Sequence, residues 1–406
     1  MNKSVESTGT PTQLIKGVFW VPENLDRKIP GEIKIQHDGS FILTTQKAFS
    51  RDECVIEDTV YGELDSGEAV SMHNAMYRQK TCGVGEIPPS TLSAPILFIG
   101  KTHLKSKKSI KGQNFEFELK GLESWFEDAT SAEGKRETTL TTSGLTINLR
   151  YSATKGNSAA TSNITSYTPA TIEQFQTALH RAVTFISFAT GTILLQGKTR
   201  MTKGEEKWDL YYKPSFFTSQ TGEKNSPLFD FKYEHIQNRF NSWNKIYNKA
   251  LPLIILYFRP KLSESEPNTK LLLKCQLIEA LHKKLDQKEE MKYFERVVEV
   301  VSRQKYKSLL FQVKRDQKEA IEKLCRDITR SRNYLTHYSR ENPPDAANSE
   351  NLPFLYFKID LIVDLFLLDK LGFDEKYFKK IQPDSISDRF ERKKKLTQFL
   401  NTPRYY

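Results

Sequence analysis

The sequence predicts an α+β protein with two domains, a β-rich first domain that contains a few helices and an all-helical second domain. A chain of 406 residues is too long for one ordinary hydrophobic core. Short segments of alternating apolar and polar residues dominate before residue 155, whereas apolar residues recur at helical spacing beyond residue 268. Pro260 and Pro267 delimit a polar, aperiodic segment of the kind that links domains. We therefore predict domains over 1–258 and 268–406, joined by a linker over 259–267.

Most of the first domain is expected to consist of short strands. The segments 32–36 and 40–44 flank His37-Asp38-Gly39, which is typical of a hairpin turn, and Phe115 to Leu119 alternates like a half-exposed strand. Further strands are predicted over 18–21, 60–64, 96–99, 145–151, 192–198 and 208–212. The Ser- and Thr-rich stretch 154–162 is predicted to be a loop. One helix should begin at Pro169 and run to about Ser187, and another should span about 233–247.

The second domain reads as a series of helices with an excess of positive charge. Helices are predicted over 268–285, 288–302, 313–339, 353–371 and 387–400. Residues 251–406 hold 31 Lys and Arg against 23 Asp and Glu, so 31 − 23 = +8 of the net charge of +11 lies here. The densest cluster comprises Arg389, Arg392, Lys393, Lys394 and Lys395. This cluster is a candidate contact for an RNA backbone, and the alternative is a solvated helix face.

Arg332, Asn333 and His337 form the most informative motif of the second domain. RNA carries its own nucleophile, the 2′-hydroxyl, so a nuclease needs only a group that transfers protons and a cation that stabilises the phosphorane transition state. Imidazole, with an ordinary pKa of about 6.5, suits the first task, and the permanently charged guanidinium suits the second. We interpret His337 as the acid–base group and Arg332 as the electrostatic clamp. Asn333 lies one helical turn before His337 and would orient the imidazole or a substrate oxygen.

The place of Arg332 in the predicted helix also permits a purely structural interpretation. Arg332 projects within about 20° of Ile321, in the middle of an apolar stripe. A charge there needs a partner, for instance Glu279 on a neighbouring helix, and a buried salt bridge would suffice to explain it. Arg332 and His337 also diverge by about 140° on a regular helix, so they cannot easily share one phosphate. A break near the end of the helix, the long reach of Arg or a symmetric dimer would bring them together, and we favour the dimer.

The motif and the N-terminal segment together resemble a known family. Arg-Asn-x-x-x-His near the end of a helix, inside an all-helical C-terminal region, resembles the motif of HEPN-domain ribonucleases. Four N-terminal landmarks resemble ApeA-type anti-phage HEPN proteins: Gly17 to Pro22, Pro30 to Ile33, the Asp38-Gly39 turn and Gly121 to Phe126. The resemblance implies a metal-independent endoribonuclease, dimeric or larger, that cleaves cellular RNA such as tRNA when phage infection is sensed. It assigns the catalytic motif to Arg332, Asn333 and His337, and it makes the N-terminal domain the regulator, with a phage component as trigger.

Cysteine spacing and hydropathy argue against disulfides, zinc and membrane insertion. The four cysteines form no CxxC pair, and no histidine has a partner at metal-ligand spacing. Residues 1–14 lack the apolar core of a signal peptide, and the most apolar run, 352–368, is interrupted by Lys358, Asp360 and Asp364. We therefore expect a cytoplasmic protein with no metal or cofactor.

Two further functional classes remain open. A non-catalytic RNA-binding or assembly protein could keep the helical fold and bind RNA without cutting it. An interaction protein of a toxin pair could use Arg332 in an interface salt bridge, and RNA would then be irrelevant.

Overall fold

The computed structural model divides into two compact units, each built from several segments of the chain. It describes residues 13–36, 38–49, 56–80, 89–104, 110–126, 134–154, 157–213, 227–229, 231–232, 235–262, 265–305, 307–311, 317–337, 344–348 and 351–380. The sheet unit comprises 1–120, 132–180 and 195–219, and the helical unit comprises 121–131, 181–194 and 220–406. The predicted α+β class, β-rich first and helical afterwards, is confirmed.

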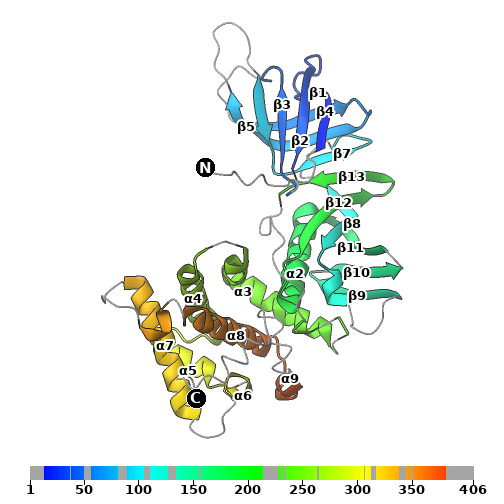
Figure 1. Ribbon diagram of the computed structural model, residues 1–406. Coiled ribbons are helices and arrows are strands. Elements are labelled where there is room, and N and C mark those ends of the chain that lie inside the picture. The colour runs from blue at the N-terminus through cyan, green and yellow to red at the C-terminus, as the bar shows by residue number, and fades with distance from the viewer. Residues whose placement is uncertain are drawn as a thin grey trace. The chain divides into compact units, whose positions relative to one another are not determined.

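The strands of the sheet unit form one antiparallel sheet, part of which closes into a barrel (Figure 1). The strands are β1 (Gln13–Trp20), β2 (Ile29–Ile35), β3 (Phe41–Thr45), β4 (Ile56–Leu64), β5 (Ala69–Lys80), β6 (Ser90–Ser93), β7 (Leu97–Gly100), β8 (Lys111–Lys120), β9 (Gly134–Thr142), β10 (Leu145–Thr154), β11 (Asn157–Thr171), β12 (Leu195–Lys203) and β13 (Glu206–Tyr211). Their order is β4-β1-β2-β3-β6-β5-β7-β13-β12-β8-β11-β10-β9, and an additional β4–β5 pairing closes the first six. The predicted hairpin of β2 and β3 is present.

Alternating apolar side chains fill the barrel. Phe19, Ile33, Leu43 and Val60 are fully buried and belong to one hydrophobic cluster. Successive residues of a strand point to opposite faces, so this period-2 pattern directs one row inward and leaves the other exposed. A Cβ atom at Gly62 would meet the ring of Phe19, which explains why the smallest residue stands there.

The remaining strands bury one face and leave the other polar. Along β8, buried and exposed residues alternate as the sequence predicts, and Phe115 lies on the buried face. Its ring stacks on that of Phe175 from helix α2 (Ile172–Thr190), with centroids 5.4 Å apart and planes within 8°. The opposite face carries charged and amide side chains from five neighbouring strands.

The helical unit is organised around α8, whose residues 358–368 are all buried. Its elements are α1 (Glu123–Phe126), α3 (Ile236–Leu262), α4 (Pro267–Asp286), α5 (Tyr293–Val301), α6 (Lys307–Leu310), α7 (Gln317–His337), the 3-10 helix η2 (Asp345–Ala347), α8 (Leu352–Lys370) and α9 (Glu375–Lys380), together with the second part of α2 (Figure 1). α8 packs against α4, and α7 packs against α4 and α5. No helix among the described residues is long and apolar enough to cross a membrane.

The charged residues in the middle of α8 are buried and have partners. Asp360 forms an ion pair with Lys274 of α4, and Asp364 accepts a hydrogen bond of 2.7 Å from the hydroxyl of Tyr257. The ammonium of Lys358 donates to the main-chain oxygen of Leu310 at 2.7 Å, and burial lowers the pKa of Lys358 to about 7. Such pairing is what allows polar groups inside a packed core.

Several local predictions are wrong. The stretch 154–162 is largely strand, since β11 runs from Asn157 to Thr171 and pairs in register with β10. Pro169 consequently lies in β11 and does not begin the helix. Residues 259–262, which fall in the predicted linker, are helical and belong to α3, which accommodates Pro252 at a kink where Ala250 has non-helical angles (φ −144°, ψ 34°). The predicted helix over 387–400 lies outside the described residues.

The two units also divide the chain differently from the predicted domains. Segments 121–131 and 181–194 precede residue 258 but belong to the helical unit. Aromatic packing accounts for the second segment, since Phe185 and Phe188 lie 6.1 and 5.3 Å from the ring of Trp243 in α3. These buried rings stabilise the helical unit through apolar area and ring geometry together.

Candidate active site

α7 presents one apolar face to the helical unit and one polar face to solvent. The predicted stripe is confirmed, because Ile321, Leu324, Cys325, Ile328 and Leu335 are all buried. These residues recur at spacings of three, four and seven, which places them along one side of a helix. The motif residues occupy the last part of this helix, which ends at His337.

Arg332 is held on the inner side of α7 by residues from two other helices. Its Nη2 lies 3.4 Å from Oε2 of Glu279 in α4, and its guanidinium lies 4.9 Å from the ring centroid of Tyr293 in α5. Nη1 donates a hydrogen bond of 3.1 Å to Oδ1 of Asn333. The Arg332 side chain is 27% exposed, so it is only half-buried. The salt bridge of the structural interpretation is thus present, in a position that solvent still reaches.

Two neighbours of Arg332 are weakly acidic side chains that burial keeps protonated. Burial raises the pKa of the Cys275 thiol to about 12, and burial followed by the neighbouring Cys275 raises the pKa of Tyr293 well above 10. Both are therefore neutral at neutral pH, and Glu279 is the one anionic contact of Arg332 among the described residues. A guanidinium has five N–H donors, and the described contacts use only two of them. Arg332 retains donors with which it can bind a phosphate.

His337 lies on the other side of α7. It is exposed, and no hydrogen bond or ion pair joins it to Arg332 or Asn333 in the described part of the chain. The Thr336 hydroxyl donates to the main-chain oxygen of Arg332 at 2.7 Å, and helix persists through His337. A break between the two motif residues, one of the three possibilities considered, is therefore wrong. A single chain brings Arg332 and Asn333 together and turns His337 away by about 140°.

Tyr293 is a site residue that sequence reasoning missed. It approaches Arg332 only because α5 packs against α7, and no local pattern signals that contact. The basic cluster Arg389, Arg392, Lys393, Lys394 and Lys395 lies outside the described residues. Among the described residues, no three or more His, Cys, Asp or Glu side chains are grouped so that they could hold a metal ion.

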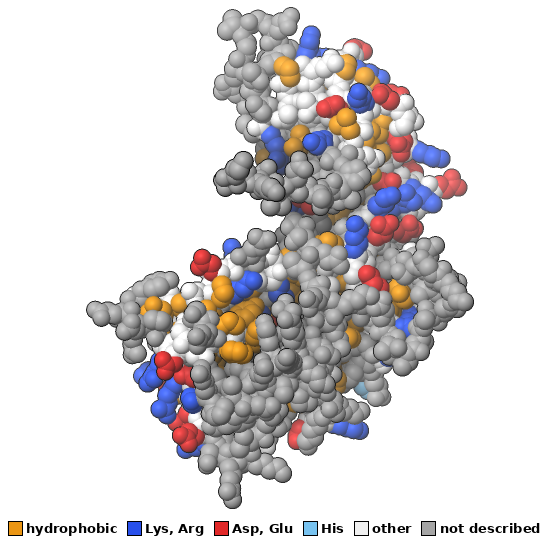
Figure 2. Space-filling view, in the orientation of Figure 1, with side chains coloured by type: hydrophobic (Ala, Val, Ile, Leu, Met, Phe, Trp, Pro, Cys, Tyr) orange, Lys and Arg blue, Asp and Glu red, His pale blue; other side chains and the backbone are white. Residues whose placement is uncertain are grey.

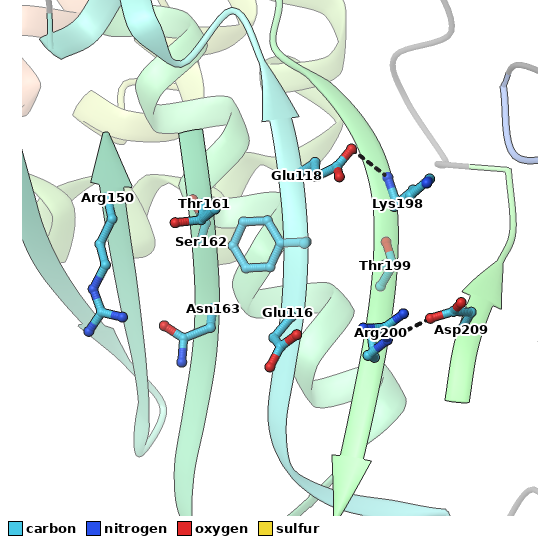
Figure 3. Close-up of a pocket in the computed structure, with 11 residues that line it drawn as sticks. Glu116, Glu118, Arg150, Thr161, Ser162, Asn163, Lys198, Thr199, Arg200 and Asp209 are labelled. Carbon is cyan, nitrogen blue, oxygen red and sulfur yellow. Dashed lines mark hydrogen bonds and ion pairs between the residues drawn. The ribbon is translucent and has the colours of Figure 1, made fainter. Parts of the chain in front are cut away.

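A second candidate site is a pocket of about 330 Å³ on the polar face of the sheet unit (Figure 3). Two interactions join residues of this pocket: Arg200 forms an ion pair with Asp209 at 2.7 Å, and the main-chain N–H of Lys198 donates to Glu118 at 3.4 Å. No histidine or cysteine is among the residues that line it. The pocket thus offers contacts for a polar ligand but no group that exchanges protons near neutral pH.

Comparison with protein families identifies both parts of the chain. The model described as ApeA N-terminal domain 1 matches residues 14–245, more than half of the chain, and the model described as Apea-like HEPN matches residues 265–377. The chain belongs to the ApeA family. The second match spans α4 to α8, so the helical region that carries Arg332 and His337 is an ApeA-like HEPN domain. No curated protein sequence and no solved structure matched.

The assignment places this ApeA-family chain among anti-phage proteins of the HEPN nuclease type, and HEPN domains are generally ribonucleases. The two matched ranges lie on either side of most of the predicted linker, whereas the compact units divide the chain elsewhere. The domain boundaries 1–258 and 268–406 stay a prediction.

Proposed function

We propose that the protein is a metal-independent endoribonuclease that cleaves cellular RNA, such as tRNA, during phage infection. The observation that carries the proposal is the arrangement at the end of α7, where a half-buried Arg332 keeps unused donors and an exposed His337 is open to a substrate. The family assignment supports the same reaction class.

The proposed reaction needs only proton transfer and charge stabilisation. His337 accepts the proton of the RNA 2′-hydroxyl, the O2′–P bond forms, and the P–O5′ bond breaks as the 5′-oxygen receives a proton from water. The protonated His337 then returns its proton to solvent. The products are a 2′,3′-cyclic phosphate and a 5′-hydroxyl. Arg332 stabilises the extra charge on the phosphorane oxygens, and Asn333 positions the guanidinium through the 3.1 Å contact. This contact supports a role for Asn333 in orienting Arg332.

A homodimer completes the proposed site. α7 is continuous through the motif, and Arg332 is turned inward to Glu279, so one chain does not present both groups to one phosphate. In a two-fold dimer, Arg332 of one copy and His337 of the other can converge. Cytoplasmic RNA is the proposed substrate pool.

The contact of Arg332 with Glu279 also favours a second candidate function. If Arg332 serves only to join α7 to α4, the HEPN domain is a non-catalytic RNA-binding or toxin-pair interaction module. The two candidates differ in one respect, which is the production of new RNA ends.

A cleavage experiment separates these candidates. Wild type and His337→Ala are expressed, and total RNA is sequenced for new ends. Purified protein is then incubated with the RNA in EDTA. We expect wild type to generate ends bearing 2′,3′-cyclic phosphate and His337→Ala to generate none, with both proteins equally folded by circular dichroism. Cleavage by His337→Ala at the wild-type rate would refute the role of His337. If the wild-type protein produces no new RNA ends, either when purified or in phage-infected cells, the second candidate is favoured.

We further propose that the sheet unit senses the infection. Family membership supports a regulatory role, and the polar pocket over β8, β10, β11, β12 and β13 offers a place for a phage-derived ligand. Arg150→Ala should then abolish protection against phage while purified protein retains RNA cleavage. Arg150 lines the pocket and is 57% exposed on its side chain, so its removal should leave folding intact. Full protection by Arg150→Ala would exclude this residue from recognition.

A further inference from the structure

The exposed face of α7 carries a row of cations that leads to His337. From residue 323 onward, the exposed cationic positions are Lys323, Arg326 and Arg330, which we call the α7 basic stripe. At 100° per residue the three stripe residues and His337 lie within about 60° of one another around the helix axis. Arg332 lies about 140° from His337 on the buried side and does not belong to this row.

Acidic residues near the stripe do not cancel its charge. Arg326 pairs with Glu322 at 2.6 Å, but these side chains are 56% and 39% exposed, and such surface pairs contribute little stability in water. Asp327 is half-buried, and its pKa is raised from the ordinary value, mainly by burial. Nearby Lys323 and Arg330 partly oppose this rise. Figure 2 shows the Lys and Arg side chains of this region at the lower left, over α7, with Asp and Glu side chains among them. The exposed positions from 323 to 337 are three cations, Asn333, Thr336 and His337, with no acid.

The spacing of the stripe fits an extended polyanion. With a rise of about 1.5 Å per residue, Arg326 lies about 4.5 Å beyond Lys323, Arg330 about 6 Å further, and His337 about 10 Å beyond that. A single RNA strand presents phosphates in succession, and proteins that bind such strands use positively charged tracks along the backbone. Exchange of the partly exposed Glu322 partner for a phosphate costs little, because the pair is weak in water.

We propose that the α7 basic stripe binds successive backbone phosphates of single-stranded RNA and guides the strand to His337. This inference rests on the proposed ribonuclease function for its direction, but the binding itself can be measured without cleavage. It assigns positioning roles to Lys323, Arg326 and Arg330, none of which belongs to the Arg332-Asn333-His337 motif.

The test measures RNA binding by full-length protein in a His337→Ala background, so that no cleavage occurs. The probe is a 20-nucleotide oligouridine with a 5′ fluorescein, followed by fluorescence anisotropy from 50 to 300 mM KCl. Arg326→Gln/Arg330→Gln removes two stripe charges. Lys245→Gln/Lys249→Gln removes two exposed charges from α3 and serves as the matched control.

Counterion release sets the expected size of the effect. Each lost phosphate contact on a single strand lowers the slope of log K against log salt by about 0.7, so the stripe variant should lose about 1.4 in slope. At 0.1 M salt this corresponds to a roughly 10- to 30-fold weaker affinity, whereas the α3 control should bind like its parent. Equal slopes and affinities for both double variants would refute the proposal that the α7 basic stripe binds RNA.

Failure of the stripe and failure of the proposed function give different results. If otherwise wild-type protein cleaves RNA and the stripe variant binds RNA normally, the proposed role of the α7 basic stripe is wrong and the proposed ribonuclease function is retained. If wild type never cleaves RNA and the stripe variant still loses slope and affinity, the stripe stands as an RNA-binding surface without a nuclease.

Discussion

Replacing Arg332 by lysine separates a catalytic arginine from a structural one. Lysine keeps the positive charge that contacts Glu279 and the Tyr293 ring, but it lacks the planar guanidinium that can donate to two phosphate oxygens at once. The same substitution therefore acts weakly on folding and strongly on the proposed reaction.

Both magnitudes follow from the geometry. The ion pair with Glu279 is 3.4 Å long and 27% and 37% exposed on its two sides, so it stabilises the helical unit by no more than about 1 kcal/mol. The contact with Tyr293 adds about 0.5–2 kcal/mol, and a lysine retains part of each. We expect Arg332→Lys to lower the free energy of unfolding by less than about 2 kcal/mol. Removing a donor to the transition-state oxyanion costs about 10²–10³ in rate.

Urea unfolding gives the first quantity, and single-turnover cleavage of a labelled RNA gives the second. Glu279→Gln is the matched control, because it removes the same ion pair and leaves the guanidinium. A structural arginine predicts that Arg332→Lys and Glu279→Gln reduce stability and cleavage alike. Cleavage by Arg332→Lys within threefold of the Glu279→Gln rate would refute the clamp.

Three further predictions concern the helical unit. Leu324→Ala should lower the free energy of unfolding by about 2–5 kcal/mol, because Leu324 is fully buried. Lys323→Ala, at an exposed position, should change it by less than about 0.5 kcal/mol. Urea unfolding curves of the two variants that coincide would contradict this prediction. Burial raises the pKa of Cys275 and Cys325 to about 12, so peptide mapping should find neither alkylated by iodoacetamide at pH 8 in native protein and both alkylated in urea. Burial lowers the pKa of Lys358 from 10.5 to about 7, so between these pH values the unfolded chain binds a proton that the folded chain does not. The free energy of unfolding of wild type, relative to that of Lys358→Met, should therefore rise with pH by up to about 1.4 kcal/mol per pH unit in this window and stay constant below pH 6. A difference between the two proteins that stays constant from pH 6 to 9 would contradict this prediction.

Local patterns in the sequence predicted the elements that depend on local physics. The apolar residues of α7 recur at helical spacing, so its buried face and the inward direction of Arg332 follow from periodicity alone. A charge in that face requires a partner, and this requirement pointed to Glu279, which is the residue that Arg332 contacts. The alternation along β8 likewise determined its buried face.

Features that depend on distant pairing were not predictable in this way. Residues 157–162 have the composition of a loop, yet they form strand because residues 149–154 of β10 pair with them in register, and β8 pairs with β11 from Ser162 onward. The segments 121–131 and 181–194 join the helical unit through packing that no window of the sequence reveals. The contact of Tyr293 with Arg332 spans α5 and α7 and has the same cause.

The divergence of Arg332 and His337 on one continuous α7 leads to a final prediction about assembly. If each site combines Arg332 of one copy with His337 of the other, Arg332→Ala and His337→Ala proteins are each inactive alone but complement when mixed. Random exchange makes half of the dimers mixed, and each mixed dimer has one intact site out of two, so about one quarter of wild-type activity should return.

The result distinguishes a shared site from one built within a single chain. A site within one chain gives no recovery, because neither variant holds both groups. Mixing Arg332→Ala with the double variant Arg332→Ala/His337→Ala is the control, since no mixed dimer then contains an intact arginine. The two variants must be unfolded and refolded together before assay, so that exchange is complete. If no activity returns although subunit exchange is verified, Arg332 and His337 do not form a shared site across a dimer axis. The site would then have to form within one chain, through the long reach of Arg332.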